Sequence, residues 1–406
     1  MIFKQTKILF ILFVFIFVFK FSFLVQAALP GQMNLKYNYE MFVLNINDPN
    51  LWSEYEKWFY QGKEVFLDNN KIDNKLLEKR LVKGIDRAYL KNFLRENVAP
   101  TLQRKGQGVT IYEKDQAVFF SDKIVQVRRL NVEVSVTLIE KALKEGVDEV
   151  ELSVFIENPV LDISPELKKR GIQEIIAIGE SNFSGSSKNR IHNISTAIKK
   201  FNGFIIKKDH DFSFNEVVGT IDGHSGYKKE LVIKGPRTIP EWGGGVCQVS
   251  STLYRGLVLS GANIKERGNH SYAVSYYTPW GSDATIYPGS YDLKFFNDFP
   301  GDILIQAYIE DEKLYFVFVG TKKETPVSLF GPYITNHIPA PPTQYHPSRT
   351  LQSGQKLLIS HAHNGFIATW FRQTGTNHEK IISRYEARPK IYKVGGLSEI
   401  RIGSLD

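Results

Sequence analysis

The chain has 406 residues, of which 42% are hydrophobic, 13% aromatic and 23% charged. This length is enough for two or three domains, and the composition excludes an intrinsically disordered or fibrous protein. The formal net charge of +8 is mild and spread along the chain without a basic run, so we expect no nucleic-acid partner.

The N-terminus has the pattern of an export signal. Lys4 and Lys7 precede a largely apolar stretch over residues 8–25, which is interrupted by Lys20 and followed by small residues. We therefore predict that residues 1–27 are a signal peptide. The stretch of about 18 residues is also near the minimum for a spanning helix, so an uncleaved anchor in the cytoplasmic membrane is the alternative. Under both interpretations the rest of the chain is extracytoplasmic, either secreted or membrane-anchored.

Residues 40–170 predict an α+β domain. Apolar residues at helical spacing predict a helix over 76–94, and residues 109–112 and 117–120 predict two strands joined by a polar turn.

Residues 171–323 predict a second, mixed α/β unit. Helical spacing recurs over 190–201, and a second helix is expected from the glycine loop at 243–245 to Gly261, where a glycine stop follows. Strand patterns follow, and the first of them covers 271–277.

Short strand patterns over residues 325–395 predict a small all-β module, with an exposed linker at the proline-rich stretch 336–347. The predicted fold class is therefore α+β and multi-domain.

Cys247 is the only cysteine, so no intramolecular disulfide can form. A lone thiol in an oxidising compartment is a hazard unless it is buried or used. Cys247 follows Gly243, Gly244 and Gly245 at the predicted first turn of a helix, where unpaired N–H groups stabilise a thiolate and could bind an oxyanion. The glycines would let the backbone approach a substrate closely. A buried, structural cysteine is the alternative.

A reactive thiol needs a base and a group that orients the base. His270 begins the strand pattern after the helix, so the chain can return its imidazole to Cys247, and we expect the two side chains within about 5 Å. Asp283 is the candidate orienting group. A structural histidine and a turn-capping aspartate are the alternatives.

Several collinear blocks of this region resemble the VanW family: residues 184–194, 212–219, 226–230, 243–254, 266–271 and 283–285. The segment 40–170 resembles the peptidoglycan-binding domain that often precedes VanW domains, and the segment 325–395 is similar to a G5 module. Many relatives have an additional His and Pro before the residue that matches His270, and this sequence lacks them.

The resemblance implies a cysteine L,D-transpeptidase that acts on peptidoglycan and forms 3–3 cross-links, with Cys247 as nucleophile and His270 as base. It also implies a wall-associated location. Residues in or next to the matched blocks are expected to bind the substrate; they are Arg190, Gly243, Gly244, Gly245, Gln248, Ser251 and Tyr272. The alternative is a non-catalytic wall-binding or envelope accessory protein, which would not need the thiol.

No cofactor or metal is expected. His361 and His363 share one face of a predicted strand, but no third ligand accompanies them.

Overall fold

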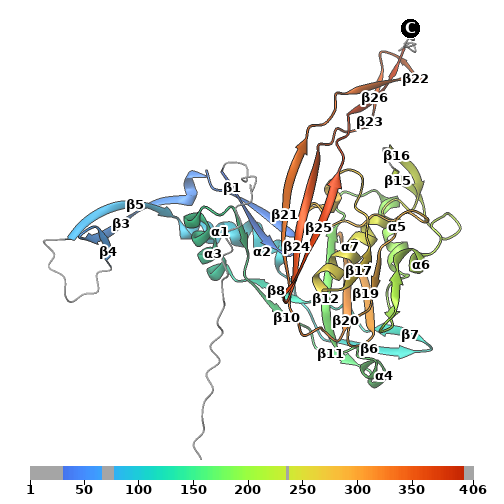
Figure 1. Ribbon diagram of the computed structural model, residues 1–406, viewed down its shortest axis with the longest axis horizontal. Coiled ribbons are helices and arrows are strands. Elements are labelled where there is room, and N and C mark those ends of the chain that lie inside the picture. The colour runs from blue at the N-terminus through green and yellow to red at the C-terminus, as the bar shows by residue number, and fades with distance from the viewer. Residues whose placement is uncertain (1–30, 66–76, 235–236, 397–406) are drawn as a thin grey trace, which may run out of the picture.

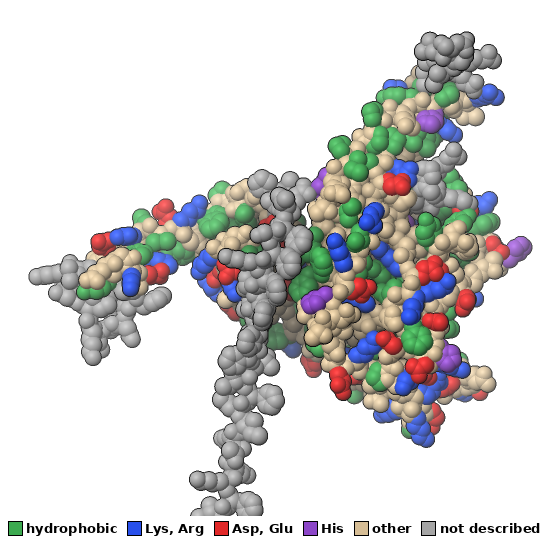
Figure 2. All heavy atoms as spheres, viewed as in Figure 1, with side chains coloured by type: hydrophobic (Ala, Val, Ile, Leu, Met, Phe, Trp, Pro, Cys, Tyr) green, Lys and Arg blue, Asp and Glu red, His purple; other side chains and the backbone are tan. Residues whose placement is uncertain are grey.

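The computed structural model describes residues 31–65, 77–234 and 237–396. The predicted signal peptide or anchor at 1–27 lies outside these residues, and none of the helices that are described is both long and apolar enough to cross a membrane. Helices and mostly antiparallel small sheets are segregated into separate layers, which confirms the multi-domain α+β class (Figure 1). Acidic and basic side chains are interspersed on the face in Figure 2.

The N-terminal part has its own hydrophobic core. Strand β1 (Gln32–Tyr37) pairs antiparallel with β2 (Glu40–Asn45) and parallel with β9 (Glu149–Glu151). Helices α1 (Arg87–Phe93) and α3 (Val132–Glu145) contribute to this core. Smaller elements complete it: η1 (Pro49–Leu51), η3 (Leu94–Val98), α2 (Ala99–Leu102), β8 (Val127–Leu130) and β10 (Val154–Glu157).

The helix predicted over 76–94 is wrong in its first half. Residues Leu77–Ile85 form strand β5, which pairs with β3 (Trp52–Tyr60) along its whole length. With β4 (Lys63–Val65) they form an arm that projects from the body in Figure 1. Leu81 is 66% exposed, so its apolar spacing does not mark a buried helix face. Cross-strand pairing outweighed the local helical pattern here.

The central layer is a four-stranded antiparallel sheet. Its order is β12 (Glu174–Asn182), β20 (Lys313–Gly320), β19 (Ile303–Glu310) and β13 (Ile205–Ile206). Side chains of β20 alternate between two hydrophobic clusters: Leu314, Phe316 and Phe318 face one, and Tyr315, Val317 and Val319 face the other. This period of two shows that β20 is buried on both faces.

Different elements cover the two faces of this sheet. Helices α5 (Lys188–Ile198) and α7 (Val246–Ser260) contribute to the core on one face. The other core includes residues of β6 (Val109–Lys114) and β11 (Leu161–Ile163), and Val118 and Phe120 of β7 (Ala117–Phe120) pack against it. Residues 109–125 were predicted to belong to the domain at 40–170, but they share a hydrophobic core with the central sheet.

The remaining central elements are α4 (Pro165–Lys169), α6 (Phe214–Val218), β14 (Asp211–Ser213), β15 (Lys229–Lys234), β16 (Arg237–Trp242), β17 (Asn263–Glu266), η4 (Ser275–Tyr277) and β18 (Lys294–Phe296).

The described C-terminal residues form two three-stranded sheets. The first has the order β21 (Val327–Ile338), β24 (Gly365–Thr374) and β25 (Asn377–Tyr385) and lies beside the central body. The second, with β22 (Gln344–Ser353), β26 (Ile391–Gly395) and β23 (Lys356–Ser360), projects away from the body in Figure 1. The proline-rich stretch 336–347 is not a linker between domains, because it begins inside β21 and ends inside β22.

Candidate active site

Cys247 lies in the first turn of α7, as the glycine loop predicts. Gly245 caps the helix with a φ of +113°, a conformation that favours glycine. A Cβ atom at Gly243 would collide with Ile221, and one at Gly244 would lie 2.8 Å from the Cβ of Glu230. These glycines are buried against protein atoms, so the reason for them is tight packing of the turn rather than the expected approach to a substrate.

Cys247, His270 and Asp283 form a continuous hydrogen-bonded relay. The side chains of Cys247 and His270 are hydrogen-bonded to each other. The Nδ1 atom of His270 lies 2.6 Å from Oδ2 of Asp283, and the backbone N–H of His270 donates to the same oxygen at 2.7 Å. Because a carboxylate only accepts, Nδ1 carries the proton, and Nε2 faces the thiol.

The charges in this relay support one another. Burial alone would raise the pKa of Cys247, but the hydrogen bond and charge of His270 outweigh burial and lower it. Burial alone would lower the pKa of His270, but Asp283 and Cys247 raise it to about 9. His270 likewise holds the pKa of Asp283 far below its usual range. The arrangement therefore favours a thiolate beside an imidazolium.

The imidazole ring of His270 is buried and stacks on an aromatic ring. The His270 side chain is only 3% exposed, and its ring stacks on Tyr277 with centroids 4.2 Å apart. Tyr277 belongs to the 3-10 turn η4, so the strand predicted over 271–277 is wrong. The turn brings Tyr277 back over His270, which an extended strand would not do.

The second oxygen of Asp283 accepts hydrogen bonds from residues outside the predicted site. The hydroxyl of Tyr385 donates to Oδ1 at 2.5 Å, and Nη2 of Arg267 lies 3.2 Å from the same atom. Burial, and then the charge of Asp283, raise the pKa of Tyr385, which keeps its hydroxyl protonated. Arg267 also donates to Ser383 at 2.8 Å. Arg267 lies in a block, residues 266–271, that resembles the VanW family, whereas no sequence pattern indicated Tyr385.

Hydroxyl groups of α7 fix the strand-like segment opposite Cys247. Ser250 donates to the carbonyl of Ala284 at 2.6 Å, and the N–H of Ala284 donates to Ser251 at 2.9 Å. This places the hydroxyl of Thr285 3.8 Å from the sulfur of Cys247. Ser251 was expected to contact the substrate. Its side chain is fully buried, and its hydroxyl is hydrogen-bonded within the protein.

Gln248 is also fully buried, and its side chain is hydrogen-bonded at both ends. Its Nε2 donates to Ser181 at 2.7 Å, while its Oε1 accepts from Nη2 of Arg190 at 3.0 Å. Gln248 therefore orients Arg190, whose guanidinium lies over the ring of Tyr276 at 4.5 Å. Tyr272 is 7% exposed and packs against His363, so it too is a buried structural residue here.

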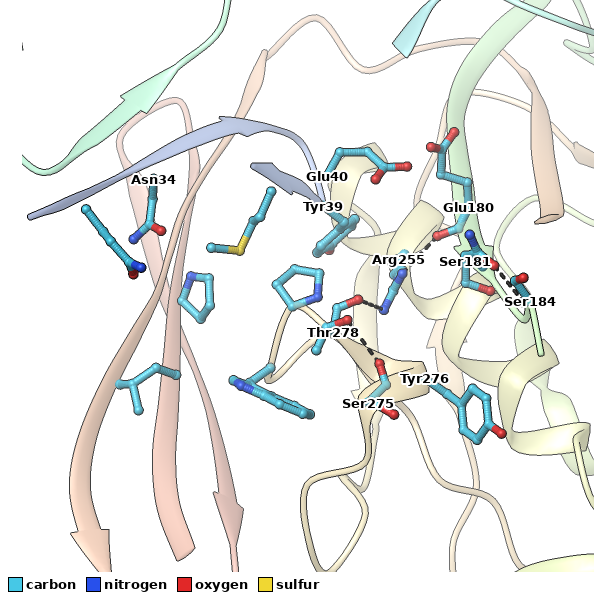
Figure 3. Close-up of a pocket in the computed structure, with 17 residues that line it drawn as sticks. Asn34, Tyr39, Glu40, Glu180, Ser181, Ser184, Arg255, Ser275, Tyr276 and Thr278 are labelled. Atoms are coloured by element: carbon cyan, nitrogen blue, oxygen red, sulfur yellow. Dashed lines mark hydrogen bonds between the residues drawn. The ribbon is translucent and has the colours of Figure 1, made fainter. Parts of the chain in front are cut away.

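A cavity of about 910 Å³ lies near this network, and Tyr276 belongs to its wall (Figure 3). Its other walls come from the β1–β2 hairpin, from β12 and from β21. Figure 3 shows Arg255 at its centre, where the guanidinium donates to the carbonyls of Thr278 at 2.9 Å and Glu180 at 3.0 Å. Three parts of the chain thus meet around one polar and aromatic cavity.

A family model described as "VanW like protein" matches residues 189–319. The chain therefore contains a VanW-like domain, which covers about a third of its length. Cys247, His270 and Asp283 all lie inside the VanW-like domain, whereas Tyr385 lies outside it.

Two curated proteins are similar to the VanW-like region. "Uncharacterized protein YoaR" of Bacillus subtilis (strain 168) is 36% identical over 156 residues, which are 37% of this chain and 51% of that protein. "Vancomycin B-type resistance protein VanW" of Enterococcus faecalis (strain ATCC 700802 / V583) is 32% identical over 131 residues, 31% of this chain and 47% of that protein. The chain thus spans about half the length of these relatives.

One solved structure, titled "Crystal structure of HP0197-G5", is 11% identical and covers 18% of this chain and 100% of its own. Its TM-score of 0.10 is too low to establish the fold of any part of the chain.

Proposed function

We propose that this protein is a cysteine acyltransferase of the cell envelope that acts on peptidoglycan stem peptides as an L,D-transpeptidase. The observation that supports this proposal most strongly is the buried relay Cys247–His270–Asp283. A thiolate, a base and an orienting carboxylate are the three parts that nucleophilic acyl transfer requires.

The reaction runs in two balanced steps. The Cys247 sulfur attacks the carbonyl carbon of the third stem residue, and a sulfur–carbon bond replaces the carbon–nitrogen bond to the terminal D-alanine. The imidazolium of His270 gives its proton to the departing amine. The side-chain amine of a second stem then attacks the thioester carbon and gives a proton to His270. The new carbon–nitrogen bond replaces the sulfur–carbon bond, which forms the 3–3 cross-link and releases the Cys247 thiolate. The N–H of Cys247 at the helix terminus is the proposed donor to the oxyanion.

The substrate class rests on the family resemblance and on the name of one relative, which associates that relative with vancomycin resistance. The exported, wall-associated location follows from the N-terminal pattern and from the substrate. The proposed partner is therefore peptidoglycan, and an uncleaved N-terminus would add the cytoplasmic membrane.

Mass spectrometry of purified protein incubated with a disaccharide-tetrapeptide tests the activity. We expect a dimer that has lost one D-alanine, and none with Cys247→Ala. Release of D-alanine without a dimer would make the protein a carboxypeptidase, since water would then resolve the thioester. An unchanged tetrapeptide, with protein that is still folded, would contradict the proposal.

A non-catalytic wall-binding protein is the competing function. It would not need a lowered pKa at Cys247, and labelling with a carbapenem separates the two. We expect a covalent adduct on Cys247 that Asp283→Asn forms more slowly. Tight peptidoglycan binding without any adduct would favour the binding protein.

A further inference from the structure

Arg190 is a half-buried cation whose hydrogen bonds in the described part of the chain go to uncharged side chains. Its guanidinium donates to Gln248, and it is hydrogen-bonded to the hydroxyl of Tyr277. No carboxylate in that part of the chain forms an ion pair with it, and its buried Nε has no hydrogen-bond partner. A buried donor without a partner is unfavourable, so the guanidinium has an unused N–H that an anion could accept from.

Three contacts connect Arg190 to the surroundings of the nucleophile. Gln248, which accepts its hydrogen bond, follows Cys247 directly in the chain. Tyr277 stacks on His270 with its ring. The backbone of α5 packs against the helix cap, because a Cβ at Gly245 would lie 3.1 Å from the carbonyl oxygen of Arg190. The cation is therefore linked to each reacting group through one residue, to Cys247 through the adjoining Gln248 and to His270 through Tyr277.

The surroundings fix the orientation of Arg190. Gln248 is fixed at its other end by Ser181, which itself lies 2.6 Å from the hydroxyl of Thr252. One face of the guanidinium is covered by Tyr276, a ring that is 36% exposed and lines the cavity of Figure 3.

We propose that Arg190 binds the free carboxylate of the residue that the reaction releases, and so restricts the enzyme to peptides that end one residue beyond the scissile bond. This inference rests on the proposed acyl transfer. Successive residues are about 3.8 Å apart, so the carboxylate one residue beyond the scissile bond matches a cation that is one residue removed from the nucleophile. An arginine fork binds a carboxylate with two parallel hydrogen bonds, and an uncharged amide cannot accept them both.

Two tetrapeptide donors that differ only at their end test this inference on the full-length protein. One ends in a free carboxylate and the other in a carboxamide. Intact-protein mass spectrometry follows the thioester on Cys247. We expect the acid to acylate on the order of tenfold to a hundredfold faster than the amide, because the amide leaves Arg190 without its partner.

Arg190→Gln should remove this preference by slowing the acid and leaving the amide nearly unchanged. Lys188→Gln removes an exposed positive charge from the same helix and should keep the preference. Equal rates for both donors with unaltered protein would overturn the role of the carboxylate, whatever the variant does. A preference that survives in Arg190→Gln would overturn the role of Arg190. Acylation by neither donor, in protein whose thiol still reacts with iodoacetamide, would overturn the acyl transfer itself and this inference with it.

Discussion

At the scale of single residues, the reactivity of Cys247 depends on the charge of its neighbour. The hydrogen bond and charge of His270 lower the pKa of the thiol against the effect of burial. The thiolate therefore persists as pH falls below the ordinary thiol pKa, and it is lost only when pH passes the lowered value. We predict that the rate of alkylation by iodoacetamide stays high at neutral pH and declines on the acid side.

Asp283→Asn supplies the matched variant for this measurement. Without the carboxylate, the pKa of His270 falls, the imidazolium is lost, and the pKa of Cys247 rises toward its ordinary value. The midpoint of the alkylation profile should therefore move to higher pH. Identical profiles for the two proteins would show that the helix terminus alone sets the thiol pKa.

Tyr385 positions Asp283 without contacting the reacting atoms. Tyr385→Phe removes one hydrogen bond to a buried carboxylate, which is worth about 1.5–3 kcal/mol. We predict a tenfold or greater loss in kcat for acylation with little change in KM, because the base is less well oriented while the substrate contacts remain. The pH profile of kcat should shift as well, since the pKa of Asp283 rises.

Tyr345→Phe is the control, because Tyr345 is 53% exposed and lies in β22, in the sheet that projects away from the body in Figure 1. It should leave kcat and the pH profile unchanged. A Tyr385→Phe protein that is less stable but has wild-type kcat and an unshifted profile would assign Tyr385 to folding alone.

At the scale of elements, α7 positions the site because it lies very close to the central sheet. A Cβ atom at Gly256 would meet the ring of Phe318 and lie 3.0 Å from the backbone nitrogen of Gly179. Alanine normally stabilises a helix relative to glycine by about 1 kcal/mol. We predict instead that Gly256→Ala lowers the free energy of unfolding by roughly 1–3 kcal/mol, because overpacking displaces the helix.

Thermal unfolding of Gly256→Ala and Gly108→Ala measures this effect. A Cβ at Gly108 would make only ordinary van der Waals contact at 3.6 Å, so this variant should unfold close to the unaltered protein. A Gly256→Ala protein that is as stable as Gly108→Ala would mean that the helix does not depend on this close approach.

Elements bounded by strong local signals could be predicted from the sequence. Helix α7 begins after three glycines and ends at Gly261, whose φ of +74° is the left-handed cap that the glycine predicts. The strand β5 and the turn η4 could not be predicted in this way. Their conformations depend on partners elsewhere in the chain, on β3 for the former and on the packing of Tyr277 against His270 for the latter.

The same reasoning explains which part of the site was predictable. Cys247, His270 and Asp283 lie within 37 residues of chain, and helix and return segment bring them together. Tyr385 lies 102 residues beyond Asp283 and meets it only because β25 packs against the central body. The internal roles of Gln248 and Ser251 depend on burial, which their polar side chains did not suggest.

At the scale of the whole molecule, the first C-terminal sheet is joined to the central body by specific hydrogen bonds. Trp370 donates to the carbonyl of Trp280 at 2.8 Å, and Tyr385 and Ser383 complete the contacts around Asp283. We predict that a chain ending at residue 323 loses most of its acylation activity. Residues 171–323 were predicted to be a separate domain, but in such a fragment the buried carboxylate of Asp283 would lose its hydrogen bond from Tyr385.

Thermal unfolding and the alkylation profile of this fragment check the prediction. We expect a lower Tm and a profile shifted to higher pH, as for Asp283→Asn. A fragment with wild-type stability and rate would show that the VanW-like domain is complete without the C-terminal sheet.

Because β25 brings Tyr385 to Asp283 from 102 residues further along the chain, a ribosome delivers the thiol, the imidazole and the carboxylate well before the tyrosine that supports them. The nucleophile is made first and the residue that completes its support comes last. A nascent chain that still lacks Tyr385 would therefore carry a thiol whose base is less well oriented. Full reactivity would arise only after β25 has been made and has packed against the central body, so folding of this strand would act as the last step of activation.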